Sequence, residues 1–186
     1  MNADIRKAMR KQRAALSAEE VEVLSSGVVA QIFASEEFKA AKTIMLYRTF
    51  KGEVSLEALL NAPECQGKTL AFPLCISDTE MIAVVPEGEG CWKTGMYGIQ
   101  EPVPEKSRTI APEEIDLMLC PCTAFDEDCN RLGMGGGYYD RYLPKCKNAR
   151  IAAVAYEFQK SPDIYVNRHD FKMEKVFTEK TVYTRK

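Results

Sequence analysis

The stretch DLMLCPCTAFDEDCNRLGMGGGYYDRYL, residues 116–143, carries in turn a strand pattern, a glycine-rich loop and the start of a helix. Residues 116–121 form a short apolar run of the kind found in buried strands. Four glycines within residues 133–137 permit positive φ angles and let a ligand approach the main chain closely. Residues 135–143 predict a helix that is stopped by Pro144. A strand, a loop and a helix in this order are typical of an α/β protein.

The rest of the chain predicts the same architecture. The spacing of apolar residues predicts a first helix over about residues 5–13. A second helix begins at the capping box Ser17–Glu20 and runs to about Ala34. A short helix is expected over residues 55–60. Further strands are expected at residues 43–49, 68–73, 80–85 and 150–156.

Residues 86–114 are rich in Gly, Pro and Glu, and we expect them to form a long loop or an irregular crossover. No internal repeat or long linker divides the chain. We therefore predict a single α/β domain over residues 1–186, with three layers and a largely parallel sheet covered by helices on both faces.

The composition excludes several classes of protein. The chain has 186 residues, 46% of them hydrophobic, and its 25 Lys and Arg against 27 Asp and Glu give a net charge of −2. It is therefore neither a disordered acidic chain nor a globally basic nucleic-acid-binding protein. No apolar run reaches the roughly 18 residues of a membrane span, and the basic N-terminus lacks the features of a secretory signal. We expect a cytoplasmic monomer that binds neither nucleic acid nor a membrane.

The seven cysteines are an odd number in a chain without a secretory signal, which predicts reduced thiols rather than a disulfide framework. Cys120, Cys122 and Cys129 lack the Cys-x-x-Cys spacing of a zinc knuckle, and His169 is far away in sequence. We expect buried or incidental thiols.

The glycine-rich loop is either a tight packing turn or a cradle for phosphate. It is not a Walker loop, because no Gly-Lys-Ser/Thr follows it. Arg131 places a permanent cation at the entrance of the loop. Asp140, in the first turn of the predicted helix, either holds a divalent cation against phosphate oxygens or complements the helix dipole.

Other polar residues are candidates by position. Asp170 is either a surface acid or a second cation ligand. Glu53 follows Gly52 at the carboxyl end of a predicted strand, where α/β sheets bind ligands, although it could also complement a helix N-terminus. The first helix carries Arg6, Arg10 and Arg13 along one stripe, which either stays in water or meets an anion.

Residues 119–143 resemble the 5-formyltetrahydrofolate cyclo-ligases, also called methenyltetrahydrofolate synthetases. The match is to that family's Pro-x-x-x-Phe-Asp followed by Arg-Leu-Gly-x-Gly-x-Gly-Tyr-Tyr-Asp. Supporting matches follow in the same order along the chain: the basic first helix, Gly52-Glu53-Val54, Gly98-Ile99-Gln100-Glu101-Pro102, and the Asp170 loop with Val176 and Thr178 beyond it. The resemblance implies a fold like that of the sugar-phosphate isomerase and CoA-transferase class.

The resemblance also implies an activity, the ATP- and Mg²⁺-dependent conversion of 5-formyltetrahydrofolate to 5,10-methenyltetrahydrofolate with release of ADP and phosphate. Phosphoryl transfer needs mainly positioning and charge stabilisation from the protein, so no protein nucleophile is required. One alternative is a relative on the same fold that acts on a different phosphorylated or formylated substrate. Another is a non-catalytic protein that binds a nucleotide or folate.

Roles for individual residues follow from the resemblance. Asp140 and Asp170 would be the magnesium ligands, and Arg131, Tyr138 and Asp140 would be catalytic. Folate would contact Arg48, Glu53, Tyr97, Met134, Gly135, Gly136, Gly137 and Tyr138. ATP would contact Asn2, which stands where many members carry a lysine, together with Arg6, Arg10, Arg131, Leu132, Gly133, Met134, Gly135, Gly136, Gly137, Tyr138 and Tyr139.

Overall fold

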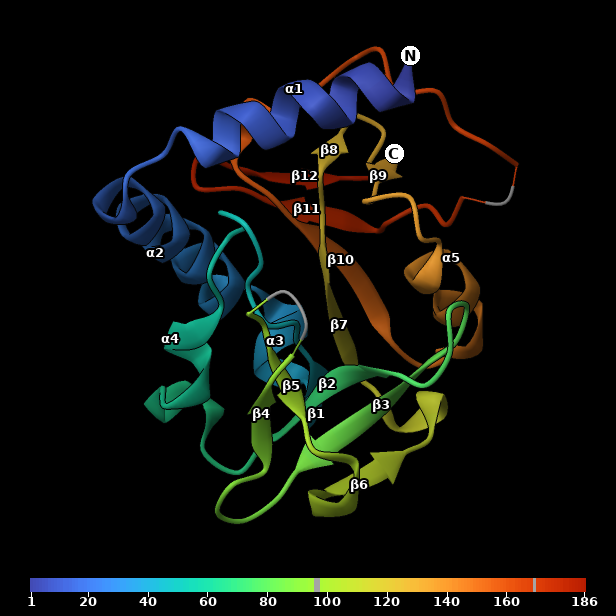
Figure 1. Cartoon of the computed structure of the whole chain (residues 1–186). Coiled ribbons are helices and arrows are strands. Elements are labelled where there is room, and N and C mark those ends of the chain that lie inside the picture. Colours follow the sequence, from blue (N-terminus) through green and yellow to red (C-terminus); the bar gives the residue numbers. More distant parts are fainter. Residues whose placement is uncertain (96–97, 169) are drawn as a thin grey trace.

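The computed structural model describes residues 1–95, 98–168 and 170–186 (Figure 1). An eight-stranded sheet runs in the order β12-β11-β10-β7-β1-β2-β3-β6. From β11 to β2 the neighbouring strands are parallel, and the remaining pairs are antiparallel. This confirms the expected largely parallel sheet. The strands are β1 (Thr43–Met45), β2 (Thr69–Cys75), β3 (Met81–Pro86), β6 (Ser107–Ile110), β7 (Leu117–Pro121), β10 (Arg150–Val154), β11 (Lys175–Phe177) and β12 (Val182–Thr184).

Two of the helices, α2 and α3, begin at serine caps. At the start of α2, the Glu20 N–H donates to Ser17 Oγ and the Ser17 N–H donates to Glu20 Oε2, which confirms the predicted capping box. The α-helices are α1 (Asn2–Ala14), α2 (Ala18–Ala34), α3 (Glu36–Ala40), α4 (Glu57–Leu60) and α5 (Tyr138–Tyr142). Short 3-10 turns occupy Pro63–Cys65, Pro104–Lys106, Pro112–Glu114, Leu143–Lys145 and Glu157–Gln159.

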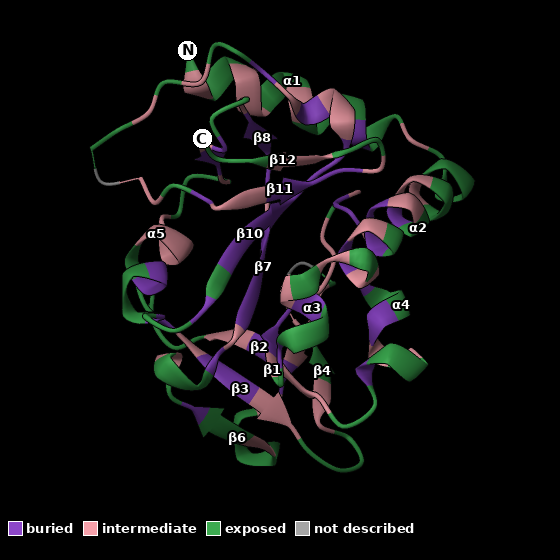
Figure 2. Ribbon diagram, turned by 180° about the vertical axis from the view of Figure 1, so that it is seen from behind, coloured by how far each residue is buried: buried purple, intermediate pink, exposed green. Residues whose placement is uncertain are grey.

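The central strands are buried on both faces, so each strand contributes alternate side chains to two cores (Figure 2). In β7, Leu117 and Leu119 pack in the core covered by α2, α3 and α4. Met118 and Cys120 point the opposite way, into the core covered by α5. The expected arrangement of helices on both faces is therefore confirmed, and each fully buried aliphatic side chain contributes about 1.5–3 kcal/mol.

The prediction for residues 86–114 was wrong in part. A hairpin of β4 (Trp92–Thr94) and β5 (Gln100–Pro102) lies there, and β6 joins the main sheet beside β3. These strands are only three or four residues long, too short to show the apolar alternation that marks longer strands. The strands β11 and β12 were not predicted either, because each is only three residues long.

Several element boundaries also differ from the prediction; the strand expected over 150–156, for example, ends at Val154. The strand expected over 43–49 ends at Met45, although the Leu46 N–H still donates to the Ala71 carbonyl. The helix expected from residue 135 begins at Tyr138, because Gly135 and Gly137 have φ angles of 108° and 69°. The α-helix ends at Tyr142, before Pro144 as predicted, and Pro144 lies in the 3-10 turn that follows.

The fold brings α1 across the carboxyl edge of the parallel strands, next to the short hairpin of β8 (Ala124–Phe125) and β9 (Arg131–Leu132) (Figure 1). Ligands of α/β sheets bind at this edge. All seven cysteines lie within the described residues and are free thiols, as predicted. Within the same residues, no helix combines the length and apolarity needed to cross a membrane.

Candidate active site

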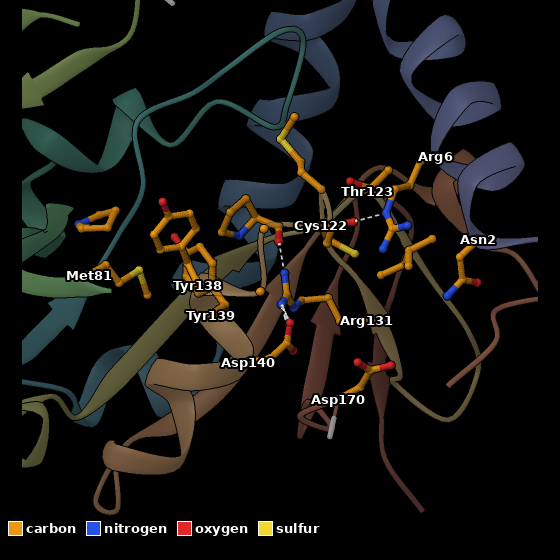
Figure 3. Close-up of a pocket in the computed structure, with 18 of the residues that line it drawn as sticks. Asn2, Arg6, Met81, Cys122, Thr123, Arg131, Tyr138, Tyr139, Asp140 and Asp170 are labelled. Carbon is orange, nitrogen blue, oxygen red and sulfur yellow. Dashed lines mark hydrogen bonds and ion pairs between the residues drawn. The ribbon is translucent and has the colours of Figure 1, made fainter. Parts of the chain in front are cut away.

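A cavity of about 400 Å³ lies at the carboxyl ends of β1, β2 and β7, within the usual size range of ligand sites. Figure 3 shows Asn2 and Arg6 of α1 on one side and Met81 and Tyr138 on the other, with Arg131 between them. The lining residues are Asn2, Arg6, Glu53, Pro73, Cys75, Met81, Pro121, Cys122, Thr123, residues 131–140, Asn167 and Asp170.

The glycine-rich loop forms one wall and keeps its backbone accessible. None of the N–H groups of residues 133–137 donates a hydrogen bond to another described residue. Gly137, in the left-handed region, caps α5, and a Cβ there would lie 2.6 Å from Arg141 Nη1. Arg141 in turn holds the loop, because its Nη2 donates to the Gly136 carbonyl and its Nε to Thr79. The loop thus lines the cavity with N–H groups that no described residue occupies, which suits an anion.

Arg131 lies beneath the loop, with its side chain 3% exposed. Its Nη1 donates to the Pro121 carbonyl at 3.1 Å, and its Nη2 lies 3.2 Å from Asp140 Oδ1. A Cβ on Gly133 would lie 2.8 Å from Arg131 Nη1, so glycine is required where the loop crosses the guanidinium. Arg131 therefore supports the loop from below and orients Asp140.

The carboxylates of Asp140 and Asp170 line the cavity (Figure 3). Asp140 accepts from Arg131 and from the Phe171 N–H at 3.4 Å, and its side chain is 26% exposed. Asp170 Oδ2 accepts from the Asn167 N–H at 2.7 Å. Among the described residues, no group of three or more His, Cys, Asp or Glu side chains could hold a metal ion. A pair of carboxylates in one cavity nevertheless suits Mg²⁺, which is held by one or two carboxylates together with substrate oxygens.

The helix α1 contributes to the opposite side. Arg6 Nε donates to the Gly133 carbonyl at 2.8 Å, so its guanidinium lies against the glycine-rich loop. Asn2 Nδ2 donates to the Tyr165 carbonyl at 2.8 Å, and Asn2 Oδ1 accepts from the Tyr165 N–H at 2.9 Å. Asn2 thus joins the start of α1 to the segment that precedes Asp170.

Glu53 is a buried carboxyl in the cavity wall. Its Oε1 lies 3.5 Å from Nη1 of Arg13, and its Oε2 accepts from the Phe50 N–H at 3.2 Å. Burial raises the pKa of Glu53 to about 7, although the Arg13 guanidinium and the Phe50 N–H act in the opposite direction. The pairing of Glu53 with Arg13 was not predicted.

Cys122 also lines the cavity, but its chemistry is inert at neutral pH. Burial raises the pKa of its thiol to about 12, and its Sγ donates to the Ala124 carbonyl. Since the thiolate is the nucleophilic form, Cys122 provides no nucleophile here. Sequence reasoning had not placed Cys122 or its neighbour Thr123 in the site; their position just after the predicted strand 116–121 is the signal that could have done so.

The family model of the 5-formyltetrahydrofolate cyclo-ligase family matches residues 1–179. The chain belongs to this family. The 5-formyltetrahydrofolate cyclo-ligase of Haemophilus influenzae is 33% identical over 159 residues, which cover 83% of this chain and 84% of that protein. The mouse cyclo-ligase is 29% identical over 191 residues, covering 94% and 92% of the two chains.

Solved structures give the same result. The NMR structure of the Aquifex aeolicus 5,10-methenyltetrahydrofolate synthetase superposes with a TM-score of 0.85 at 34% identity, covering 98% of this chain and 92% of that chain. The Mycoplasma pneumoniae synthetase gives a TM-score of 0.79 at 28% identity, covering 96% and 98%. Membership of the cyclo-ligase family confirms the expected enzyme class, a ligase.

Two described residues that were expected to contact ligands in a cyclo-ligase do not line the cavity. Arg48 pairs with Glu57 at 3.1 Å and stacks on Trp92, 4.7 Å from the ring centroid. Arg10 Nε donates to the Arg6 carbonyl, and its side chain lines a separate groove. Tyr97 lies outside the described residues.

Proposed function

We propose that this chain catalyses the ATP-dependent cyclisation of 5-formyltetrahydrofolate to 5,10-methenyltetrahydrofolate, with release of ADP and phosphate. The observation that carries the proposal is one cavity with free loop N–H groups, the Arg6 guanidinium and two carboxylates, all beside the buried carboxyl of Glu53. The loop N–H groups, the Arg6 guanidinium and the two carboxylates together suit a triphosphate with its Mg²⁺. Glu53 suits the N–H donors of a pterin ring.

The chemistry explains why such a site is sufficient. A formyl group on nitrogen is a poor electrophile, because the nitrogen lone pair is delocalised into the carbonyl. Transfer of the γ-phosphoryl group to the formyl oxygen forms an O–P bond, breaks the bond to the β-phosphate and releases ADP. N10 of the folate then attacks the formyl carbon and loses its proton. This attack closes the ring, and phosphate then leaves with the C–O bonding electrons, which gives the methenyl carbon.

The residues of the chain act by position and charge. The free N–H groups of residues 133–137 and the guanidinium of Arg6 would hold the phosphates and stabilise the charge of transfer. Arg131 would keep the loop and Asp140 in place, and Tyr138, whose hydroxyl donates to the Ser77 carbonyl, would fix the far end of the loop. No protein nucleophile takes part.

Asp140 and Asp170 would hold Mg²⁺ when it is bound. The cation would then supply charge neutralisation on the phosphate oxygens. Arg131, which donates to Asp140, fixes the direction of that carboxylate. Monomeric state and cytoplasmic location stay predictions.

The test is a turnover assay with the purified chain, 5-formyltetrahydrofolate, ATP and Mg²⁺. We expect methenyltetrahydrofolate and ADP to form in a ratio of one to one and only when all three are present. Loss of ATP without ring closure would indicate a different substrate, and binding of both compounds without turnover would indicate a non-catalytic binding protein.

A further inference from the structure

Arg13 and Glu53 form an ion pair that is almost fully removed from solvent. The side chain of Arg13 is 0% exposed and that of Glu53 is 6% exposed, with Nη1 and Oε1 3.5 Å apart. Nε, Nη1 and Nη2 of Arg13 make no hydrogen bond to any described residue. Glu53 lines the cavity, whereas Arg13 lies behind it.

Such a pair is a poor way to stabilise a fold. Desolvation of two charges costs several kcal/mol per ion, and replacement by apolar side chains is often neutral or stabilising. The cost is highest when the buried donors lack acceptors, as those of Arg13 do. The placement of Arg13 is therefore better explained by its effect on Glu53 than by stability.

Arg13 is the charged group that faces Glu53. The other titratable groups that act on this carboxyl come from four further segments and are Tyr47, Cys122, Tyr139 and Tyr156. Burial raises the pKa of each of these groups, so all four are uncharged at neutral pH. Within the described part of the chain, Arg13 thus supplies the positive potential at Glu53, assisted by the Phe50 N–H.

The local backbone holds the two residues together. Lys51 and Gly52 have φ angles of 45° and 71°, and this turn directs Glu53 back toward the end of α1. A Cβ on Gly52 would lie 2.9 Å from the carbonyl oxygen of Arg13. The turn and the helix therefore approach so closely that only glycine fits between them.

We propose that Arg13 is a positioning residue, which favours the ionised form of Glu53 and holds it at the cavity wall so that its carboxylate accepts the N–H donors of the folate ring. The inference rests on the proposed function and deepens it. Positions 6 and 13 fall on the same face of α1, about two turns apart. One helix thereby serves both halves of the site, with Arg6 at the glycine-rich loop and Arg13 at Glu53.

The first test compares Arg13→Met with Lys11→Met, which removes a cation from an exposed position on the same helix. Glu53 is followed by NMR in protein labelled with ¹³C at the glutamate carboxyls, and its signal is assigned from its absence in Glu53→Gln. We expect Glu53 to titrate at a pH about 1–3 higher in Arg13→Met than in the wild type. Lys11→Met should leave it unchanged. An unshifted midpoint in Arg13→Met overturns the proposal.

The second test measures the Kd for 5-formyltetrahydrofolate from pH 6 to pH 9. In Arg13→Met we expect affinity to fall about tenfold or more at pH 7 and to recover toward pH 9, as the remaining carboxyl ionises. The KM for ATP should stay within about twofold of the wild type. Arg13→Lys, which keeps the charge, should restore most of the affinity at pH 7. A loss of affinity that is independent of pH indicates a merely structural role and overturns the proposal.

Glu53→Gln keeps the proposal falsifiable even if Arg13→Met does not fold. The pH dependence of the wild-type Kd around pH 7 should vanish in Glu53→Gln, and its persistence contradicts the role given to the pair. Failure of the proposed function is distinguishable from failure of the role given to Arg13. In the first case the wild-type protein would not cyclise 5-formyltetrahydrofolate, while the shift of the Glu53 midpoint would still be measured.

Discussion

The carboxylate of Asp140 faces the Arg131 guanidinium on one side and the cavity on the other. Changing Asp140 to Asn keeps an oxygen that can accept from Arg131 but removes the negative charge offered to a cation. Loss of a residue that only hydrogen-bonds to a metal ligand lowers metal affinity about 10–100-fold. Asp140 would be a ligand itself, so we expect the Mg²⁺ concentration for half-maximal activity to rise at least about tenfold. The measurement is turnover against Mg²⁺ concentration at saturating ATP.

Asp163→Asn is the matched control, because Asp163 is exposed in the segment before Asp170 and does not line the cavity. It should leave the magnesium requirement unchanged. An Asp140→Asn enzyme with the wild-type requirement would remove this carboxylate from the metal site.

Gly135 tests the loop as a phosphate cradle. Its φ is 108°, and a Cβ there would come within 3.7 Å of the Arg6 guanidinium. Changing Gly135 to Val should place methyl groups in the space needed by phosphate and raise the KM for ATP at least about tenfold. Gly88→Val is the control, since Gly88 has a φ of 77° in open space. Both substitutions should cost about 1–3 kcal/mol in unfolding free energy. Only Gly135→Val should weaken ATP binding, and normal ATP affinity in that variant contradicts the cradle.

At the scale of elements, α1 is joined to the opposite rim of the cavity through Asn2. Asn2→Ala removes both hydrogen bonds to Tyr165. We expect the unfolding free energy to fall by no more than about 0.5–1.5 kcal/mol for each hydrogen bond that is lost. Hydrogen exchange in residues 161–168 should become faster. Asn2→Asp, which can still accept from the Tyr165 N–H, should give an intermediate rate. An unchanged exchange rate in Asn2→Ala would show that this link does not hold the segment.

The sequence predicts the elements whose signals are local. The Ser17–Glu20 capping box and the apolar run 116–121 each span only a few residues, and both were confirmed. The short edge strand β6 has two exposed residues among its four, so its pattern does not differ from that of a loop. The glycine-rich loop was recognised because its residues are contiguous. The ion pair between Arg13 and Glu53 was not, because it depends on a turn whose φ angles no single residue specifies.

At the scale of the whole molecule, the site lies where both cores end. The strands β1, β2 and β7 are parallel, so their carboxyl ends meet at one edge and bring Glu53, Cys75 and Cys122 to one cavity. The two apolar cores hold this edge rigid, but they also force Glu53 into a buried position. The result is a carboxyl whose ionisation is coupled to folding.

This coupling predicts how stability changes with pH. Burial raises the pKa of Glu53 from 4.5 to about 7 in the folded chain, so between these values the folded state binds more protons than the unfolded state. The contribution of Glu53 to stability is therefore greatest below pH 4.5 and is lost as pH rises through about 7. Carboxylates bound to donors at the surface, such as Glu20 at the Ser17 N–H and Glu127 at Lys160, have lowered pKa values and titrate below this window.

Urea unfolding of the wild type and of Glu53→Gln at pH 5 and pH 8 isolates the effect, because all other groups titrate alike in the two proteins. The difference in unfolding free energy between wild type and variant should move by about 3 kcal/mol in favour of the variant from pH 5 to pH 8. Glu127→Gln, at an exposed carboxylate whose pKa is lowered by Lys160, should show no such change in this window. If the wild type and Glu53→Gln lose stability in parallel, then Glu53 titrates as an ordinary glutamate, and burial does not raise its pKa in the folded chain.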